Sequence, residues 1–161
     1  MDSVTTTPED EQDQLTSTVL AVVLRVAGPV VTEVYPHALG TPQRQVTARI
    51  GDVLIYLTDP RAAARIRQRW DAATHLVAQR LPEQVSQTWL APDPDAYPVG
   101  ITVRLDGPVR VATEWVAGSR ALGVPPHQRA RVGRLVWQIC DFQAWRTIGD
   151  TWFDIQRYLE Q

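Results

Sequence analysis

Apolar side chains recur every three or four positions along residues 132–159, and this stripe constrains the fold more than any other feature of the sequence. It comprises Val132, Leu135, Ile139, Phe142, Trp145, Ile148, Trp152, Ile155 and Leu159. Trp137, Cys140 and Phe153 lie beside the stripe, and an apolar face of that width predicts burial on more than one side. We therefore expect a long C-terminal helix that starts near Pro126 and that Gly149-Asp150 can divide into two.

A second helix is predicted from residue 60 onward. Asp59 is a good N-cap residue, and Pro60 is favoured at the first helical position. An amphipathic stripe follows at spacings of three and four, made by Ile66, Trp70, Ala73, Val77 and Leu81. Pro82 ends this central helix.

Strand patterns occupy much of the remaining chain. Residues 45–50 and 53–58 flank Gly51-Asp52, which predicts a tight hairpin, and residues 30–35 precede them as a third strand. Residues 99–105 and 109–116 predict a second hairpin across Asp106-Gly107-Pro108. Residues 16–27 fit two structures, because their β-branched side chains favour a strand while Leu15, Val19, Val22 and Val26 share one helical face. We find no internal repeat by this reading.

This order of elements predicts the fold class. We expect a single α+β domain in which an antiparallel sheet, a meander plus a hairpin, is covered by a central helix and a long Trp-rich C-terminal helix. We expect the domain to span residues 15–161 and residues 1–14 to form an acidic, disordered tail. If residues 8–27 are helical, the order of elements resembles that of the dimeric secretion chaperones. The resemblance is confined to element order, so it transfers no functional residue.

Composition limits the cellular setting and the chemistry. No apolar run is long enough to span a membrane, and the sequence does not begin with a secretory signal, so we expect a cytoplasmic protein. All 16 basic residues are arginine, which is typical of a bacterial chain from a G+C-rich genome or of phosphate and carboxylate recognition. The absence of lysine excludes a P-loop lysine and a Schiff base, and Cys140 is the only cysteine. Cys140 stands in an apolar stretch, which predicts a buried, inert thiol.

No catalytic constellation stands out. His37, His75 and His127 are isolated from one another and from other ligand residues, and no glycine-rich phosphate loop or nucleophile elbow is present. The acidic pairs Asp93/Asp95 and Asp150/Asp154 are explained by turn formation and by local ion pairs, respectively. We therefore predict no cofactor and no metal, and a non-enzymatic role is favoured over an enzymatic one.

The leading functional hypothesis is a protein–protein interaction module, an accessory, chaperone-like or regulatory protein that forms a homodimer or binds another protein. The wide apolar face motivates it, and the predicted interface residues are Trp137, Phe142, Trp145, Ile148, Trp152, Ile155 and Leu159. A spacing of three and four is typical of a helix seam shared between chains. No membrane partner is expected.

Two alternatives come from other classes. Residues 61–80 and 120–134 each carry a net charge of +4, which is typical of a nucleic-acid-associated regulator or of a solvated face. The candidate phosphate contacts are Arg61, Arg65, Arg69, Arg129, Arg131 and Arg134. The second alternative is a small-ligand binder or enzyme with a Trp-lined pocket near His37.

Overall fold

The computed structural model describes residues 18–86 and 99–161, and the predicted α+β class is confirmed. In chain order the elements are β1 (Val22–Val26), β2 (Thr32–His37), β3 (Gln45–Ile50), β4 (Val53–Leu57), α1 (Pro60–Arg80), β5 (Ile101–Leu105), β6 (Val111–Val116), β7 (His127–Val132), β8 (Leu135–Ile139) and α2 (Phe142–Leu159). Both predicted helices are present, and of the residues 16–27 that fitted either structure the described part contains the strand β1 and no helix.

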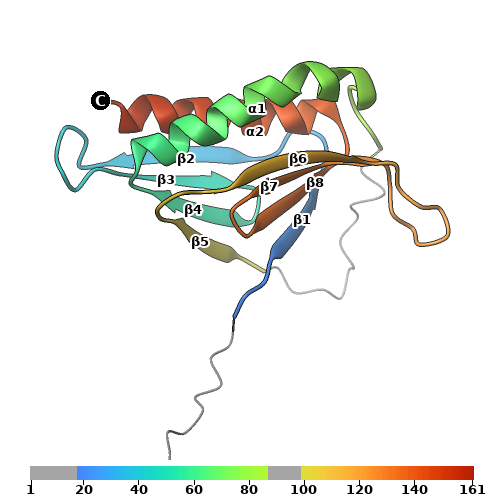
Figure 1. Cartoon of the computed structure of the whole chain (residues 1–161), viewed down its shortest axis with the longest axis horizontal. Coiled ribbons are helices and arrows are strands. Elements are labelled where there is room, and N and C mark those ends of the chain that lie inside the picture. Colours follow the sequence, from blue (N-terminus) through green and yellow to red (C-terminus); the bar gives the residue numbers. More distant parts are fainter. Residues whose placement is uncertain (1–17, 87–98) are drawn as a thin grey trace, which may run out of the picture.

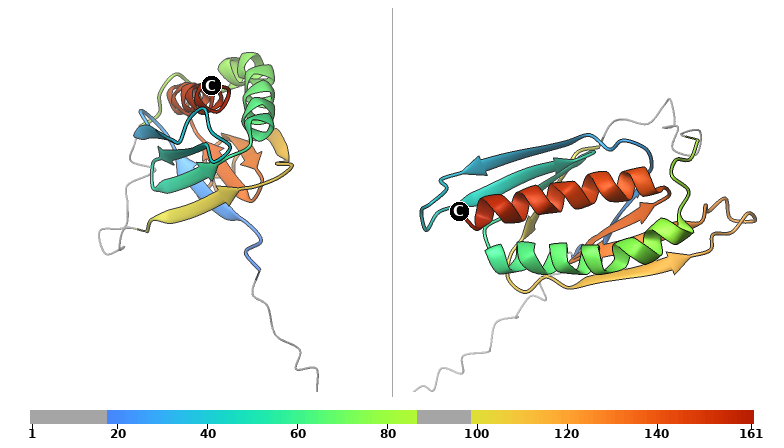
Figure 2. Two further views of the ribbon diagram at one scale, coloured as in Figure 1. Left: turned by 90° about the vertical axis from the view of Figure 1, so that its left-hand side faces the viewer. Right: turned by 90° about the horizontal axis from the view of Figure 1, so that it is seen from above.

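The strands divide into two sheets of four. One sheet has the order β2-β3-β4-β5 and the other has the order β1-β8-β7-β6. Each sheet is an antiparallel meander of three strands to which one parallel strand is added, β5 beside β4 in the first sheet and β1 beside β8 in the second. The helices α1 and α2 lie side by side over both sheets (Figures 1 and 2).

The two sheets have the same topology because the chain contains a structural repeat that the sequence reading missed. The first half runs β1-β2-β3-β4-α1 and the second runs β5-β6-β7-β8-α2. In each half the first strand pairs with the last strand of the other half, so β1 joins β8 and β5 joins β4. The halves are therefore joined by an exchange of strands, and neither sheet is complete without both.

The repeat is also visible in the sequence when the two halves are aligned by the registers of their strands. Residues 22–37 match residues 101–116, and Gly28-Pro29-Val30 recurs as Gly107-Pro108-Val109. Residues 45–79 match residues 127–161 without a gap. Identical residues at matched positions in this second stretch are Ala48 and Ala130, Arg49 and Arg131, Gly51 and Gly133, Asp59 and Asp141, Ala62 and Ala144, Ile66 and Ile148, Trp70 and Trp152, and Gln79 and Gln161. The loop between β6 and β7 is longer than its counterpart between β2 and β3.

The core lies between the helices and the inner sides of the two sheets. Its largest fully buried side chains are Trp70, Trp137, Trp145, Trp152, Ile50, Ile55, Leu57, Ile66, Leu135, Ile139, Ile148 and Ile155. The rings of Trp70 and Trp145 stack with their centroids 4.1 Å apart where the two helices cross. Gly149 permits this approach, because a Cβ atom there would lie 2.9 Å from Trp70 Nε1.

Two sequence predictions about local structure are wrong. The long helix does not start near Pro126: residues 127–139 form the β7–β8 hairpin, Asp141 is the N-cap of α2, and α2 continues through Gly149-Asp150 without a break. The predicted hairpin across Asp106-Gly107-Pro108 does not form either, since β5 and β6 belong to different sheets. By contrast, the β3–β4 hairpin and the central helix with its Asp59 cap are confirmed.

Some predictions fall outside the described residues. They concern the acidic tail of residues 1–14 and the acidic pair Asp93/Asp95.

Candidate anion-binding surface

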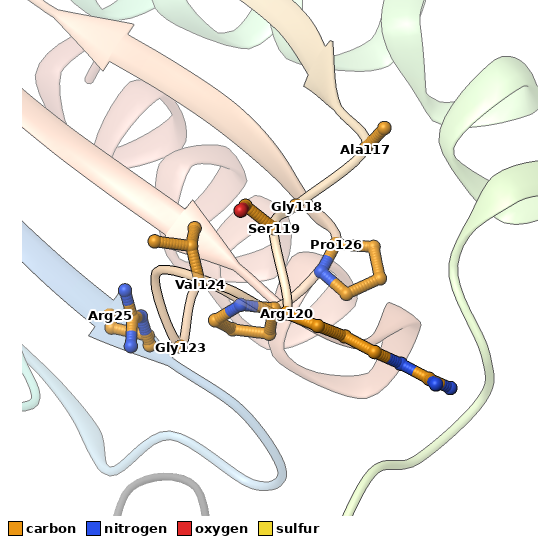
Figure 3. Close-up of a pocket in the computed structure, with 9 residues that line it drawn as sticks. Arg25, Ala117, Gly118, Ser119, Arg120, Gly123, Val124 and Pro126 are labelled. Carbon is orange, nitrogen blue, oxygen red and sulfur yellow. The ribbon is translucent and has the colours of Figure 1, made fainter.

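A groove of about 720 Å³ lies between β1 and the loop that joins β6 to β7 (Figure 3). The residues that line it are Arg25, Ala117, Gly118, Ser119, Arg120, Gly123, Val124, Pro125 and Pro126, and none of them is acidic. Arg25 lies at one end of the groove, and the side chain of Arg120 extends from the loop away from Arg25. The two guanidinium groups are therefore placed to meet separate parts of an extended anionic ligand rather than a single small anion.

The loop holds its shape through its own hydrogen bonds. The backbone amides of Ser119 and Val124 each donate to the carbonyl of the other, at 2.7 and 2.9 Å, and this closes a small hairpin. Gly118 has a positive φ of 79°, and a Cβ atom there would lie 2.6 Å from the backbone of Val124 and Pro126. Only glycine fits this close approach. Leu122, at the tip of the loop, is 79% exposed.

Beyond the groove, polar side chains run across all four strands on the outer side of the second sheet. Arg25 on β1, Gln138 on β8, Arg129 on β7 and Glu114 on β6 occupy paired positions. Arg25 Nε donates to Gln138 Oε1 at 3.0 Å, and Arg129 forms an ion pair with Glu114. The alternating residue Ala130 is buried in the core, so Arg129 projects to the side away from the helices.

The repeat supplies an internal comparison for the charges on this side. In the first half, Arg49 on β3 faces Glu33 on β2 and forms an ion pair at 3.7 Å. In the second half, the matched arginine is Arg131, but the residue that faces it on β6 is Ala112. Arg131 is exposed and has no ion pair within residues 18–86 and 99–161.

The same difference occurs at the edge strands. Arg104 on β5 lies 3.9 Å from the carboxylate of Asp106. The matched arginine is Arg25 on β1, and Ala27 stands where the acid would be. Among the described residues Arg25 has no carboxylate partner, and only its Nε has a hydrogen bond to a side chain. We call the outer side of the second sheet, with Arg25, Arg129, Arg131 and the groove, the basic face.

His127 and Cys140 lie near this face but do not form a catalytic pair. His127 Nδ1 lies 2.8 Å from the carbonyl oxygen of Pro125, to which it donates, while its Nε2 is buried without a partner among the described residues. Burial lowers the pKa of His127, and it raises the pKa of the Cys140 thiol to about 11. A thiol with that pKa is protonated at neutral pH and is a poor nucleophile, as the sequence predicted.

The residues predicted to form an interface between chains lie inside this one. Trp137, Trp145, Ile148, Trp152, Ile155 and Leu159 are buried, and Phe142 is partly buried against the same core. Their apolar faces are covered by α1 and by the two sheets of this chain, so the width of the stripe is explained by packing on more than one side within the fold. Of the three residues that widened the stripe, only Phe153 is exposed, with the Arg67 guanidinium 5.1 Å from its ring centroid.

The two arginine clusters do not form one patch. Arg61, Arg65 and Arg69 are exposed along α1, on the helical side of the molecule. Arg129 and Arg131 project from the opposite side of the second sheet, because Ala130 and Val132 between and beside them are buried. Arg134 lies in the β7–β8 turn, where its guanidinium donates to the carbonyl of Val19.

The predicted pocket near His37 is not the groove described above. His37 is exposed at the end of β2, and among the described residues neither it nor any tryptophan lines the groove. Within the described part of the chain, no group of three or more histidine, cysteine, aspartate or glutamate side chains is arranged to hold a metal ion. No helix in that part is long and apolar enough to cross a membrane.

Sequence reasoning found the basic cluster of residues 120–134 but missed the importance of Arg25, which stands alone in the apolar run of β1. The available signal was the repeat: a shift of 79 residues places Arg25 on Arg104 and Ala27 on Asp106. No protein-family model matches this chain, and no curated protein or solved structure matches it either.

Proposed function

We propose that this protein is a non-catalytic binding module whose basic face holds an acidic segment of a partner protein. One observation carries the proposal: Arg25 and Arg131 retain the positions of Arg104 and Arg49, while alanines replace the acids that pair with those two arginines. Exposed ion pairs contribute only about 0–1 kcal/mol to stability, so folding does not require these arginines. Guanidinium groups without a carboxylate partner are suited to take one from a ligand.

The surface around the arginines favours a polypeptide over a single-stranded nucleic acid. Proteins that bind single strands stack bases on aromatic rings. Within the described residues, the outward positions around Arg25 and Arg131 carry valine, alanine, glutamine and glutamate, while Trp137 and Trp115 belong to the core side of their strands. The groove also offers the apolar side chains of Val124 and the prolines, which suit an acidic segment that contains apolar residues.

Restoring the missing acids gives a direct test. Ala27→Asp and Ala112→Glu together should rebuild the ion pairs of the first half and neutralise the basic face without touching an arginine. The probe is a fluorescein-labelled peptide of seven glutamates and one leucine, and its glutamine counterpart serves as the control peptide. We expect the double variant to weaken binding of the acidic peptide at least tenfold at low salt, while Glu33→Ala, which frees Arg49 in the first half, should not weaken it. Equal affinity in wild type and double variant would overturn the proposal.

The exposed arginines of α1 support a second candidate, a nucleic-acid contact. Arg61, Arg65 and Arg69 follow one another at intervals of four residues and have no ion pair within the described chain. Phosphate binding by them would make DNA or RNA affinity fall steeply with salt, and their joint replacement by glutamine would flatten that slope. No binding of DNA or RNA oligonucleotides at low salt would remove this candidate and leave the first one intact.

A further inference from the structure

We infer that the acidic segment of residues 1–14 occupies the basic face of its own chain and competes there with the partner segment. This inference rests on the proposed function. Asp2, Glu9, Asp10, Glu11 and Asp13 are the charged residues of the segment, and it contains no arginine. A ligand of that charge is the kind that Arg25 and Arg131, which lack acidic partners among the described residues, are suited to bind.

The chain enters the described part of the fold at the same sheet that carries the basic face. The carbonyl of Val19 accepts a hydrogen bond from the Arg134 guanidinium, so the chain just before β1 is held at the β7–β8 turn. Arg131 lies three residues before Arg134 and pairs with Val136 on β8, which in turn pairs with Val23 on β1. The entry point and the basic face therefore belong to one sheet.

The length of the segment is sufficient. Arg131 lies two strands away from Val23, across β8, and Val19 lies four residues before Val23 along the chain. With the usual strand spacing and rise per residue, Val19 and Arg131 are on the order of 16 Å apart. An extended chain spans up to about 3.5 Å per residue, so Asp13 lies within about 18 Å of Thr18 and Asp10 within about 28 Å. The acidic residues 9–13 can thus reach Arg131, and those nearer the start of the chain can reach Arg25.

Competition by an attached segment has a calculable size. A short flexible connection gives an effective concentration on the order of 1 mM. If the segment binds with a Kd on the order of 100 μM, which corresponds to about −5.5 kcal/mol, it weakens a competing ligand about tenfold at that effective concentration. Salt removes the effect, because the Debye length falls to about 3 Å at 1 M.

The test uses the full chain with a neutral segment that carries Asp2→Asn, Glu9→Gln, Asp10→Asn, Glu11→Gln and Asp13→Asn. The acidic peptide described above is titrated into this variant and into wild type. We expect it to bind the variant about tenfold more tightly at 20 mM salt, with the difference lost at 0.5 M salt. In the Ala27→Asp/Ala112→Glu background, neutralising the segment should change nothing, because the basic face is already filled.

The outcomes separate this inference from the proposed function. Equal affinity for wild type and neutral-segment chain, both sensitive to Ala27→Asp/Ala112→Glu, would overturn the inference and leave the function standing. Absence of peptide binding in both would overturn the function as well. A tenfold effect that disappears on dilution, together with dimers in sedimentation, would show that the segment reaches a second copy and would overturn binding within one chain.

Discussion

Asp141 is the side chain whose removal should damage the fold most for its size. Its carboxylate is fully buried and accepts hydrogen bonds from three backbone amides: Gly28 at 2.7 Å, Val85 at 3.2 Å and Ala144 at 2.9 Å. These amides belong to the β1–β2 turn, the segment after α1 and the first turn of α2. A single side chain therefore joins three parts of the chain that are far apart in sequence.

The repeat supplies the matched control. Asp59 caps α1 at the equivalent position, but among the described residues its carboxylate accepts from one backbone amide, that of Arg61 at 2.8 Å, and the contact is exposed. Loss of an N-cap costs about 1 kcal/mol, so Asp59→Ala should lower the free energy of unfolding by about that amount. Asp141→Ala also leaves buried amides unpaired, and a hydrogen bond to a charged group is worth about 1.5–3 kcal/mol, so we expect a loss of about 3–5 kcal/mol.

Urea denaturation followed by tryptophan fluorescence measures both variants, because Trp70, Trp137, Trp145 and Trp152 are buried in the core and report its loss. The midpoint should shift much further for Asp141→Ala than for Asp59→Ala, with an unchanged dependence of free energy on urea. Losses that agree within about 0.5 kcal/mol, the usual limit of additivity between sites, would refute the reasoning. In that case the three amides would have found other partners, and the buried carboxylate would act as an ordinary cap.

Three further predictions concern the core and the groove. Gly149→Ala gains about 1 kcal/mol of helix propensity but forces a Cβ atom against Trp70. We therefore expect the free energy of unfolding to fall by about 1–2 kcal/mol net and the near-ultraviolet circular dichroism signal to weaken. A stabilised variant would contradict this packing. The pKa of His127 is lowered in the folded chain, so on acidification the unfolded chain binds this proton first, and stability should fall as the pH drops below about 6.5. The fall should be less steep in His127→Gln, a substitution that introduces the residue found at the matched position, Gln45. Parallel pH profiles of stability for the two proteins would contradict this. Cys140, with its thiol pKa raised to about 11, should react with a thiol reagent at pH 8 only after unfolding, and rapid labelling of the native protein would show that the thiol is accessible.

The parts of the fold that depend on neighbouring residues were predictable from the sequence. The Asp59 cap and the Gly51-Asp52 turn act over a few positions, and both are present as expected. The parallel pairings of β1 with β8 and of β4 with β5 join residues far apart in the chain, and no local pattern encodes them. Strand residues in such pairings carry the same apolar composition whichever neighbour they take.

The misplaced start of the C-terminal helix has a specific cause. Val132 and Leu135 face the core from either side of a two-residue turn, and their spacing of three imitates a helix. Strand periodicity was available in Leu135, Trp137 and Ile139, which alternate and are all buried. Aligning Gly51 with Gly133 would have marked residue 133 as a turn, and in the structure both glycines have a φ near 60°. Recognition of the repeat in the sequence would therefore have predicted both the β7–β8 hairpin and the matching topology of the two sheets.

The two halves share part of their core and differ in charge on the outer side of the sheets. Ile66 and Ile148 are identical at matched buried positions, and so are Trp70 and Trp152, because close packing restricts the volume at these sites. Elsewhere in the core the halves differ in size, since Ala63 is matched by Trp145 and Ile55 by Trp137. On the outer side of the sheets, Glu33 and Asp106 are matched by Ala112 and Ala27, and such exposed changes cost little stability. Core packing therefore explains the identities that the halves share, but not why one face lacks the acids and has the matched arginines. The proposed binding of an anionic segment offers a reason for that difference, and the acid-restoring variants test this function with little effect on stability.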